Sequence, residues 1–207
     1  MLFSQESIDC PVYFWHEVSI SFPDYVIDLM DKGGHPIALS GLSKFLQTGE
    51  ICWPDGKQPF VLTFDDGYLS QRNNAFPFLL DWSIPAAFCV MPGWTGDGTS
   101  HRYVSDSNVR EFSEAGMEVI SHTVNHANLV NLRLRNPGAW AAEIVESKTR
   151  LQDITGKDVI FFSYPFGAYD SPTRNLVAEN YSGALSTRSG YDHTSSDMFV
   201  LRRVRKS

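Results

Sequence analysis

The sequence predicts an α/β fold, because short apolar runs alternate with amphipathic helical stretches and Gly, Pro and Asn residues separate them. Strands that alternate with helices favour βα units and a mostly parallel sheet. Eight candidate strands indicate one domain, residues 1–207, built as a closed or distorted (β/α) barrel. These strands are Pro11–Val18, Ile37–Leu39, Pro59–Phe64, Ala86–Val90, Glu118–Ser121, Asp158–Tyr164, Gly183–Thr187 and Phe199–Val204.

Capping residues mark the helices between these strands. Asn136–Pro137 predicts the start of a long helix and Gly156 its end. Residues at helical spacing give that helix one apolar stripe: Trp140, Ile144, Val145, Lys148 and Leu151. Ser171–Pro172 opens a further helix, and Gly116 closes the helical stretch Asn108–Ala115.

Charge and composition exclude several classes of protein. Seventeen Lys and Arg against 24 Asp and Glu leave a net charge of -7, which argues against nucleic-acid binding and favours a neutral or cationic partner. No apolar run approaches the roughly 20 residues that span a bilayer. Residues 1–14 lack a signal-peptide pattern, which predicts a cytoplasmic protein if the sequence begins at its natural start.

Two adjacent carboxylates, Asp65 and Asp66, follow the apolar strand that ends at Phe64, and Gly67 comes next. Adjacent carboxylates at the mouth of a barrel repel each other unless a cation or a shared proton relieves them. Successive side chains point in different directions, so one Asp can bind a metal while the other faces a substrate. Asp-Asp-Gly is also common turn chemistry, and that interpretation stays open at this point.

Two histidines, His122 and His126, follow the strand Glu118–Ser121 and therefore belong to the same face of the barrel. Neutral imidazoles bind zinc or iron, and two histidines with Asp66 form a common catalytic ligand set that leaves coordination positions open. Paired histidines in a polar loop can also be merely solvated.

His16 lies near the end of the first strand, on the same face as Val12, Phe14 and Val18. A histidine on an otherwise apolar face is either a satisfied core residue or a proton donor that points into a site. Spacing alone favours the core residue.

An apolar strand also runs into Tyr164–Gly167, where Pro165 stiffens the backbone. A rigid loop of this kind either presents a backbone N–H to a developing oxyanion or simply ends the strand. Trp94, on another loop of this face, either stacks on a sugar ring or anchors its loop.

Together these motifs resemble the polysaccharide deacetylase family, the NodB-homology domain of carbohydrate esterase family 4. The similarity covers TFDDG at 63–67, HTVNH at 122–126 and YPFG at 164–167, together with the connecting sequence over nearly the whole chain. The resemblance implies a distorted (β/α) barrel and the metal-dependent removal of acetyl groups from N-acetylated sugars.

The resemblance also implies residue roles. Asp65 corresponds to the general base, and Asp66, His122 and His126 to the metal ligands. Zinc is the first choice for this ligand set, which also suits cobalt, nickel or iron.

The backbone N–H of Phe166, next to Pro165, corresponds to the oxyanion donor of the family. Ser163 stands where the family often has an arginine that steadies the base, and Arg203 is a candidate substitute. The chain lacks the C-terminal Leu-x-x-His that usually supplies the acid. In one branch of the family that histidine lies on an N-terminal strand, which implies that His16 is the general acid.

We therefore expect hydrolysis of N-acetyl groups from a poly- or oligosaccharide that contains N-acetylglucosamine, with release of acetate. One alternative is a metal-dependent hydrolase of a small cyclic amide, which would need a closed pocket where a polymer needs an open cleft. Another is a catalytically silent carbohydrate-binding domain, which would have no need for Asp65.

Overall fold

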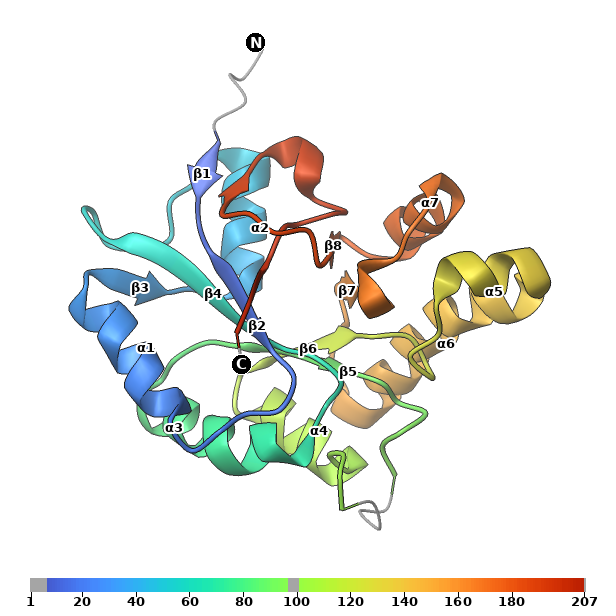
Figure 1. The fold of residues 1–207 in the computed structure, drawn as a ribbon, viewed down its shortest axis with the longest axis horizontal. Helices are drawn as coiled ribbons and strands as arrows, with labels where there is room; N and C mark the ends of the chain where they lie inside the picture. The colour runs from blue at the N-terminus through green and yellow to red at the C-terminus, as the bar shows by residue number, and fades with distance from the viewer. Residues whose placement is uncertain (1–6, 97–100, 207) are drawn as a thin grey trace.

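The computed structural model describes residues 7–96 and 101–206, and its centre is a curled sheet of parallel neighbours (Figure 1). The strand order is β10-β2-β4-β5-β6-β7-β8, with β3 paired to the start of β4. The strands are β2 (Val12–Trp15), β3 (Gly34–Pro36), β4 (Gln58–Phe64), β5 (Ala87–Val90), β6 (Glu118–Ser121), β7 (Phe161–Ser163), β8 (Gly183–Leu185) and β10 (Val204–Arg205). The α/β barrel class predicted from the sequence is confirmed.

The C-terminal segment joins the two ends of the sheet. Leu201 forms a parallel bridge with Leu185 of β8, and β10 pairs in parallel with β2 three residues later. A small antiparallel pair, β1 (Ile8–Asp9) with β9 (Asp192–His193), lies beside this sheet. The C-terminal segment therefore runs beside β8 at one end of the strand order and beside β2 at the other.

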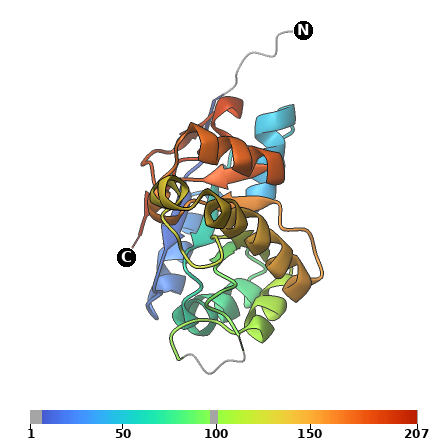
Figure 2. The same ribbon diagram turned by 90° about the vertical axis from the view of Figure 1, so that its right-hand side faces the viewer.

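Helices lie along the outside of the sheet in both views (Figures 1 and 2). The α-helices are α1 (Phe22–Asp31), α2 (Leu39–Thr48), α3 (Phe76–Asp81), α4 (Asp106–Glu114), α5 (Leu129–Arg135), α6 (Pro137–Thr155) and α7 (Ser171–Asn180). A π-helix at Gln71–Ala75 leads into α3, and 3₁₀ turns occupy Pro165–Gly167 and Ser195–Asp197. Within the described ranges, no helix is long and apolar enough to cross a membrane.

Two apolar clusters hold the fold together. The larger one lies between the sheet and its outer helices and includes Phe64, Phe88 and Phe112, whose rings stack in series. The second fills the inside of the barrel with inward-facing residues such as Val61 and Cys89, and α2 packs against it. Strand alternation explains this division, since successive side chains of each strand face opposite sides.

Helix boundaries follow the predicted capping signals closely. The Asn136 side chain accepts a hydrogen bond from the Ala139 N–H at the start of α6, and Gly156 ends that helix with φ 67°. The stripe prediction is wrong for Val145, which is 40% exposed, because the buried face of α6 runs through Ile144, Ser147 and Leu151.

Two of the predicted strands are wrong in position. Ile37–Leu39 is not a strand: β3 ends at Pro36, and Leu39 is the first residue of α2. The predicted strand Phe199–Val204 is largely irregular, and only its last residue belongs to β10. Both segments are placed by contacts with distant parts of the chain, which local patterns do not reveal.

Candidate active site

The predicted site residues meet at one end of the barrel because they follow parallel strands. Asp65 and Asp66 follow β4, His122 follows β6, and His16 follows β2. The carboxyl ends of parallel strands share one face, and chemistry in such folds lies on that face. A cavity of about 530 Å³ opens there. Six of the seven predicted residues line it: His16, Asp65, Asp66, His122, His126 and Phe166. Pro165, the residue before Phe166, is buried and is not among the lining residues.

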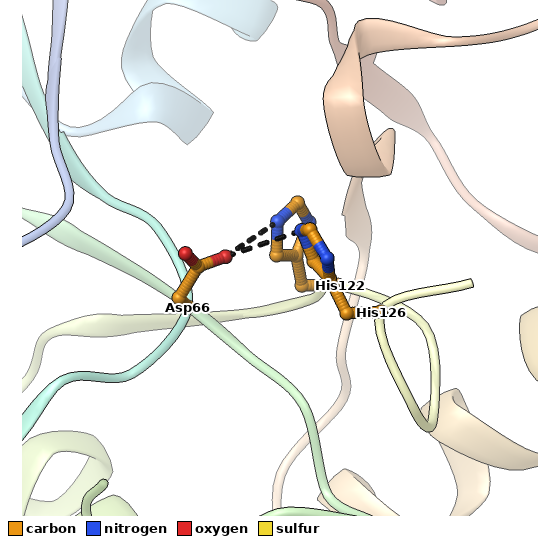
Figure 3. Close-up of side chains that lie close together, drawn as sticks. All are labelled: Asp66, His122 and His126. Atoms are coloured by element: carbon orange, nitrogen blue, oxygen red, sulfur yellow. Dashed lines mark ion pairs between the residues drawn. The ribbon is translucent and has the colours of Figure 1, made fainter. Parts of the chain in front are cut away.

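Asp66, His122 and His126 form a compact cluster whose donor atoms all lie within 4.8 Å of one another. Oδ1 of Asp66 lies 3.3 Å from Nε2 of each histidine, as Figure 3 shows. Asp66 and His126 both have positive φ, 71° and 58°. Residues other than glycine rarely adopt this conformation, and it concentrates at functional sites, where the surrounding structure enforces it.

Hydrogen bonding fixes which nitrogen of His122 faces the cluster. Its Nδ1 lies 2.7 Å from the carbonyl oxygen of Ser163, so this nitrogen donates a hydrogen bond and Nε2 is the nitrogen that faces Asp66. Burial and the neighbouring His122 lower the pKa of His126, which favours the neutral, ligating form of that imidazole.

This donor set fits a divalent metal. Oδ1 of Asp66 is buried and accepts no hydrogen bond from the part of the chain that the structure describes. A buried carboxylate oxygen without a hydrogen-bond donor is costly, and a cation between it and two imidazoles relieves that cost. The predicted ligands are therefore brought together in a candidate metal site.

Asp65 lies next to the cluster but belongs to a different pair. Its Oδ1 and Oδ2 each accept a hydrogen bond of 2.7 Å from the guanidinium of Arg203. Burial alone would raise the pKa of Asp65, but the Arg203 charge holds that pKa well below its usual range. Asp65 is thus a buried carboxylate that stays ionised.

Arg203 reaches this position from the C-terminal segment. It is fully buried, and its guanidinium lies 4.2 Å from the centre of the Phe14 ring and 3.3 Å from Oγ of Ser163. Arg203 thus contacts both the Asp65 carboxylate and Ser163, the residue at the position where the resemblance made Arg203 a candidate substitute for the arginine of the family.

His16 stands at the rim of the cavity with a third of its side chain exposed. Its Nε2 lies 4.0 Å from Oδ2 of Asp66. Its backbone carbonyl accepts a hydrogen bond of 2.7 Å from Nε2 of Gln71, which also donates to the carbonyl of Asp65. Gln71 therefore ties the His16 loop to the Asp65 loop. Nothing in the sequence pattern singled out this residue, which lies in the π-helix, a form common at functional sites.

The loop after β7 closes another side of the cavity. Phe166 has φ 60°, and its exposed ring meets the ring of His126 edge-on at 4.5 Å. Gly167 follows with φ 66° and lies against Thr187, so that a Cβ there would sit 1.9 Å from the Thr187 hydroxyl. A side chain at position 167 is therefore excluded by both backbone conformation and space.

Trp94 lies outside this cavity, as judged from the lining residues in the described ranges. Its ring is 41% exposed and packs edge-on against Tyr103 at 4.9 Å. The contact with Tyr103 anchors the Trp94 loop, and stacking on a sugar stays a prediction.

The carboxyl end of this curled parallel sheet thus holds an Asp-His-His cluster that could bind a metal ion, with a second carboxylate, Asp65, beside it. In a comparison with known families, the polysaccharide deacetylase family matches residues 54–181. The chain belongs to this family.

A relative and two solved structures show how far the similarity extends. YxkH of Bacillus subtilis (strain 168), named as a candidate polysaccharide deacetylase, is 26% identical over 149 residues, which are 71% of this chain and 51% of that protein. The chain thus spans about half the length of this curated relative.

Two solved structures share the fold of this chain. The Streptococcus pyogenes deacetylase PplD, solved in complex with acetate, superposes with a TM-score of 0.82 at 23% identity over 98% of this chain and 93% of its own. IcaB from Ammonifex degensii gives a TM-score of 0.83 at 22% identity over 95% of this chain and 91% of its own.

Proposed function

We propose that this chain is a metal-dependent N-deacetylase that hydrolyses N-acetyl groups of a saccharide containing N-acetylglucosamine and releases acetate. Membership of the polysaccharide deacetylase family supports the reaction class. One observation carries the proposal: an ionised, buried carboxylate, Asp65, lies beside a three-donor cluster in one open cavity. A silent binding domain would gain nothing from a charged carboxylate outside the ligand cluster.

Asp66, His122 and His126 would hold the metal, and zinc is the first choice for two imidazoles and one carboxylate. Cobalt, nickel and iron suit the same ligands. When bound, a divalent ion polarises the acetyl carbonyl and lowers the pKa of water toward about 7.

Asp65 is the proposed general base. It takes a proton from the attacking water, and the Arg203 ion pair keeps it unprotonated and oriented before the reaction. The oxygen of the carbonyl becomes negative as the water adds. The backbone N–H of Phe166, held in a positive-φ turn after Pro165, is the proposed donor to that oxygen.

His16 is the proposed general acid. An amide nitrogen leaves only if it is protonated, because an amide anion is a prohibitively poor leaving group. His16 lies at the cavity rim, close to Asp66, where its protonated imidazole can donate to the departing sugar amine. The overall reaction consumes one water and gives acetate and the free amine.

The test measures acetate release by the metal-reconstituted protein from N-acetylglucosamine oligomers of increasing length. Asp65→Asn is expected to lower turnover by about 10²–10⁴-fold while metal content stays at the wild-type level. His122→Ala should lose both metal and turnover. Asp153→Asn, an exposed change of the same kind on α6, serves as the matched control.

Full activity of Asp65→Asn would contradict the role of the base. Absence of acetate from every oligomer, with metal bound, would contradict the saccharide deacetylase and favour a small cyclic amide as the substrate.

A further inference from the structure

The C-terminal segment supplies the candidate site with more than Arg203. Arg203 comes directly before β10, Arg205 is the last residue of β10, and both side chains line the cavity. Arg203 lies deep, on Asp65, whereas Arg205 lies level with Phe14 of β2 and lines the mouth of the same cavity. Thr187 and Ser189 line the cavity beside it.

Arg205 also borders a second cavity, of about 250 Å³, so that one side chain stands between the two. The second cavity combines aromatic rings, hydroxyls and a second cation, from Trp15, Ser19, Ser21, Tyr25 and Lys206. The Lys206 ammonium lies 4.8 Å from the centre of the Tyr25 ring and 5.0 Å from that of Tyr13. Arg205 thus borders both cavities, and Lys206 lines the second one.

Arg205 and Lys206 differ in their ion pairing from the two arginines that come shortly before them in the sequence. Arg203 is paired with Asp65, and Arg202 with Asp192 at 3.1 Å. Neither Arg205 nor Lys206 forms an ion pair with any carboxylate in residues 7–96 and 101–206. The mouth of the site thus carries the positive charge of Arg205, although the net charge of the whole chain is -7.

We propose that Arg205 selects a saccharide that carries an anionic group, a carboxylate or a phosphate, next to the N-acetyl group that reacts. Its guanidinium presents a planar fork of donors that fits either anion with two hydrogen bonds. Lys206 adds charge in the neighbouring cavity, and the partly exposed Tyr25 gives a sugar ring apolar surface there. This inference rests on the proposed function and names the substrate class for it.

The experiment compares three sets of N-acetylglucosamine tetrasaccharides: neutral, with lactyl-ether carboxylates as in N-acetylmuramic acid residues, and phosphorylated at C6. We expect kcat/KM at least tenfold higher for one acidic set than for the neutral set, and the better acidic set identifies the anion. Arg205→Gln should lower kcat/KM for that set about tenfold and change the neutral set less than twofold. The loss should lie mainly in KM, grow smaller at high salt, and be partly restored in Arg205→Lys.

Arg135→Gln, at the exposed end of α5, makes the same charge change away from both cavities and should leave all three sets unchanged. Equal kcat/KM for neutral and acidic sets, or an acidic preference that survives in Arg205→Gln, would overturn the inference.

Calorimetric binding of the same saccharides separates this inference from the deacetylase proposal. If no set releases acetate, the proposed function fails on its own. Tighter binding of an acidic set that Arg205→Gln weakens about tenfold would still support the anion site, and equal dissociation constants for both proteins would reject it.

Discussion

The two ends of the barrel each hold a buried or partly buried carboxylate, and the pKa values of the two carboxyl groups are shifted in opposite directions. At the carboxyl end, Asp65 is bound by the Arg203 guanidinium, which holds the pKa of Asp65 well below its usual range. At the amino end, Glu118 accepts hydrogen bonds from the backbone N–H groups of Leu39 and Ser40 at 2.7 and 2.9 Å. Burial nevertheless raises the pKa of Glu118.

This difference shows which interactions keep a carboxylate ionised when it is removed from water. Backbone donors at the start of α2 stabilise the ionised form of Glu118, but they do not outweigh its desolvation. For Asp65, the full opposite charge of Arg203 with its two hydrogen bonds does outweigh the desolvation. The first arrangement fixes a helix to a strand, and the second keeps the carboxylate of Asp65, the proposed base, ionised at the candidate site.

The largest expected effect comes from removing that counter-charge. Arg203→Met leaves Asp65 buried and uncompensated, which costs about 3–5 kcal/mol in the free energy of unfolding. Acetate release should also fall steeply, because the pKa of Asp65 rises toward neutrality and the acid limb of the pH–rate profile moves upward with it. Urea unfolding and pH–rate profiles measure both effects.

Arg202→Met is the matched control, since its pair with Asp192 lies at the surface and contributes about 0–1 kcal/mol. Where Arg203→Met is too unstable to study, Arg203→Lys keeps the charge and should retain more stability and activity. Equal unfolding free energies for Arg203→Met and Arg202→Met would show that the Arg203–Asp65 ion pair is not what distinguishes the two ends of the barrel.

The loops at the two ends offer a second, smaller test. Gly167 at the carboxyl end and Gly156 at the amino end have nearly the same φ, 66° and 67°. A Cβ at Gly156 would meet no atom within 4 Å, whereas one at Gly167 would overlap Thr187. Gly156→Ala should therefore cost only the left-handed backbone strain, about 1–2 kcal/mol, without changing turnover.

Gly167→Ala should cost more and also lower kcat, by up to about 10²–10³-fold if the Phe166 N–H leaves its position. Thermal unfolding of the two variants measures the backbone strain, and acetate release measures whether the Phe166 N–H has been displaced. Equal losses in both variants would mean that the loop after β7 tolerates the displacement and that the Phe166 N–H is not positioned by this turn.

The sequence predicts the parts of the site that local patterns encode. Asp65, Asp66, His122 and His126 follow recognisable strands, so the topology of a parallel sheet brings them to one face. The caps of α6 at Asn136 and Gly156 are local signals of the same kind.

Contacts between distant residues are what the sequence does not reveal. Arg203 lies 138 residues from Asp65 along the chain, and only the resemblance to a family suggested a role for it. Leu39 was expected in a strand, but the Glu118 carboxylate binds the N–H groups at the start of α2 from 79 residues away. The bond pattern of Gln71 is equally invisible, since it depends on two backbone carbonyls that the fold brings together.

The smallest expected effect concerns Glu118 and the direction of its pH dependence. Its pKa is raised in the folded state, so its contribution to stability is complete below the unfolded value of about 4.3 and declines as the pH rises through the folded pKa. For Asp65 the sign is opposite: its contribution is present above about 3.9 and declines as the pH falls through its lowered pKa.

Glu118→Gln should therefore abolish a decline in unfolding free energy that the wild type shows as the pH rises above about 4.3. Its cost at pH 4 should be about 1 kcal/mol, because the NH2 group of Gln replaces one of the two carboxyl oxygens that face the N–H groups of Leu39 and Ser40. Glu114→Gln, an exposed change on α4, is the control and should leave the wild-type pH dependence in place. Parallel curves for wild type and Glu118→Gln between pH 4 and 8 would show that Glu118 is as well compensated as Asp65, and the contrast between backbone donors and a full counter-charge would no longer hold.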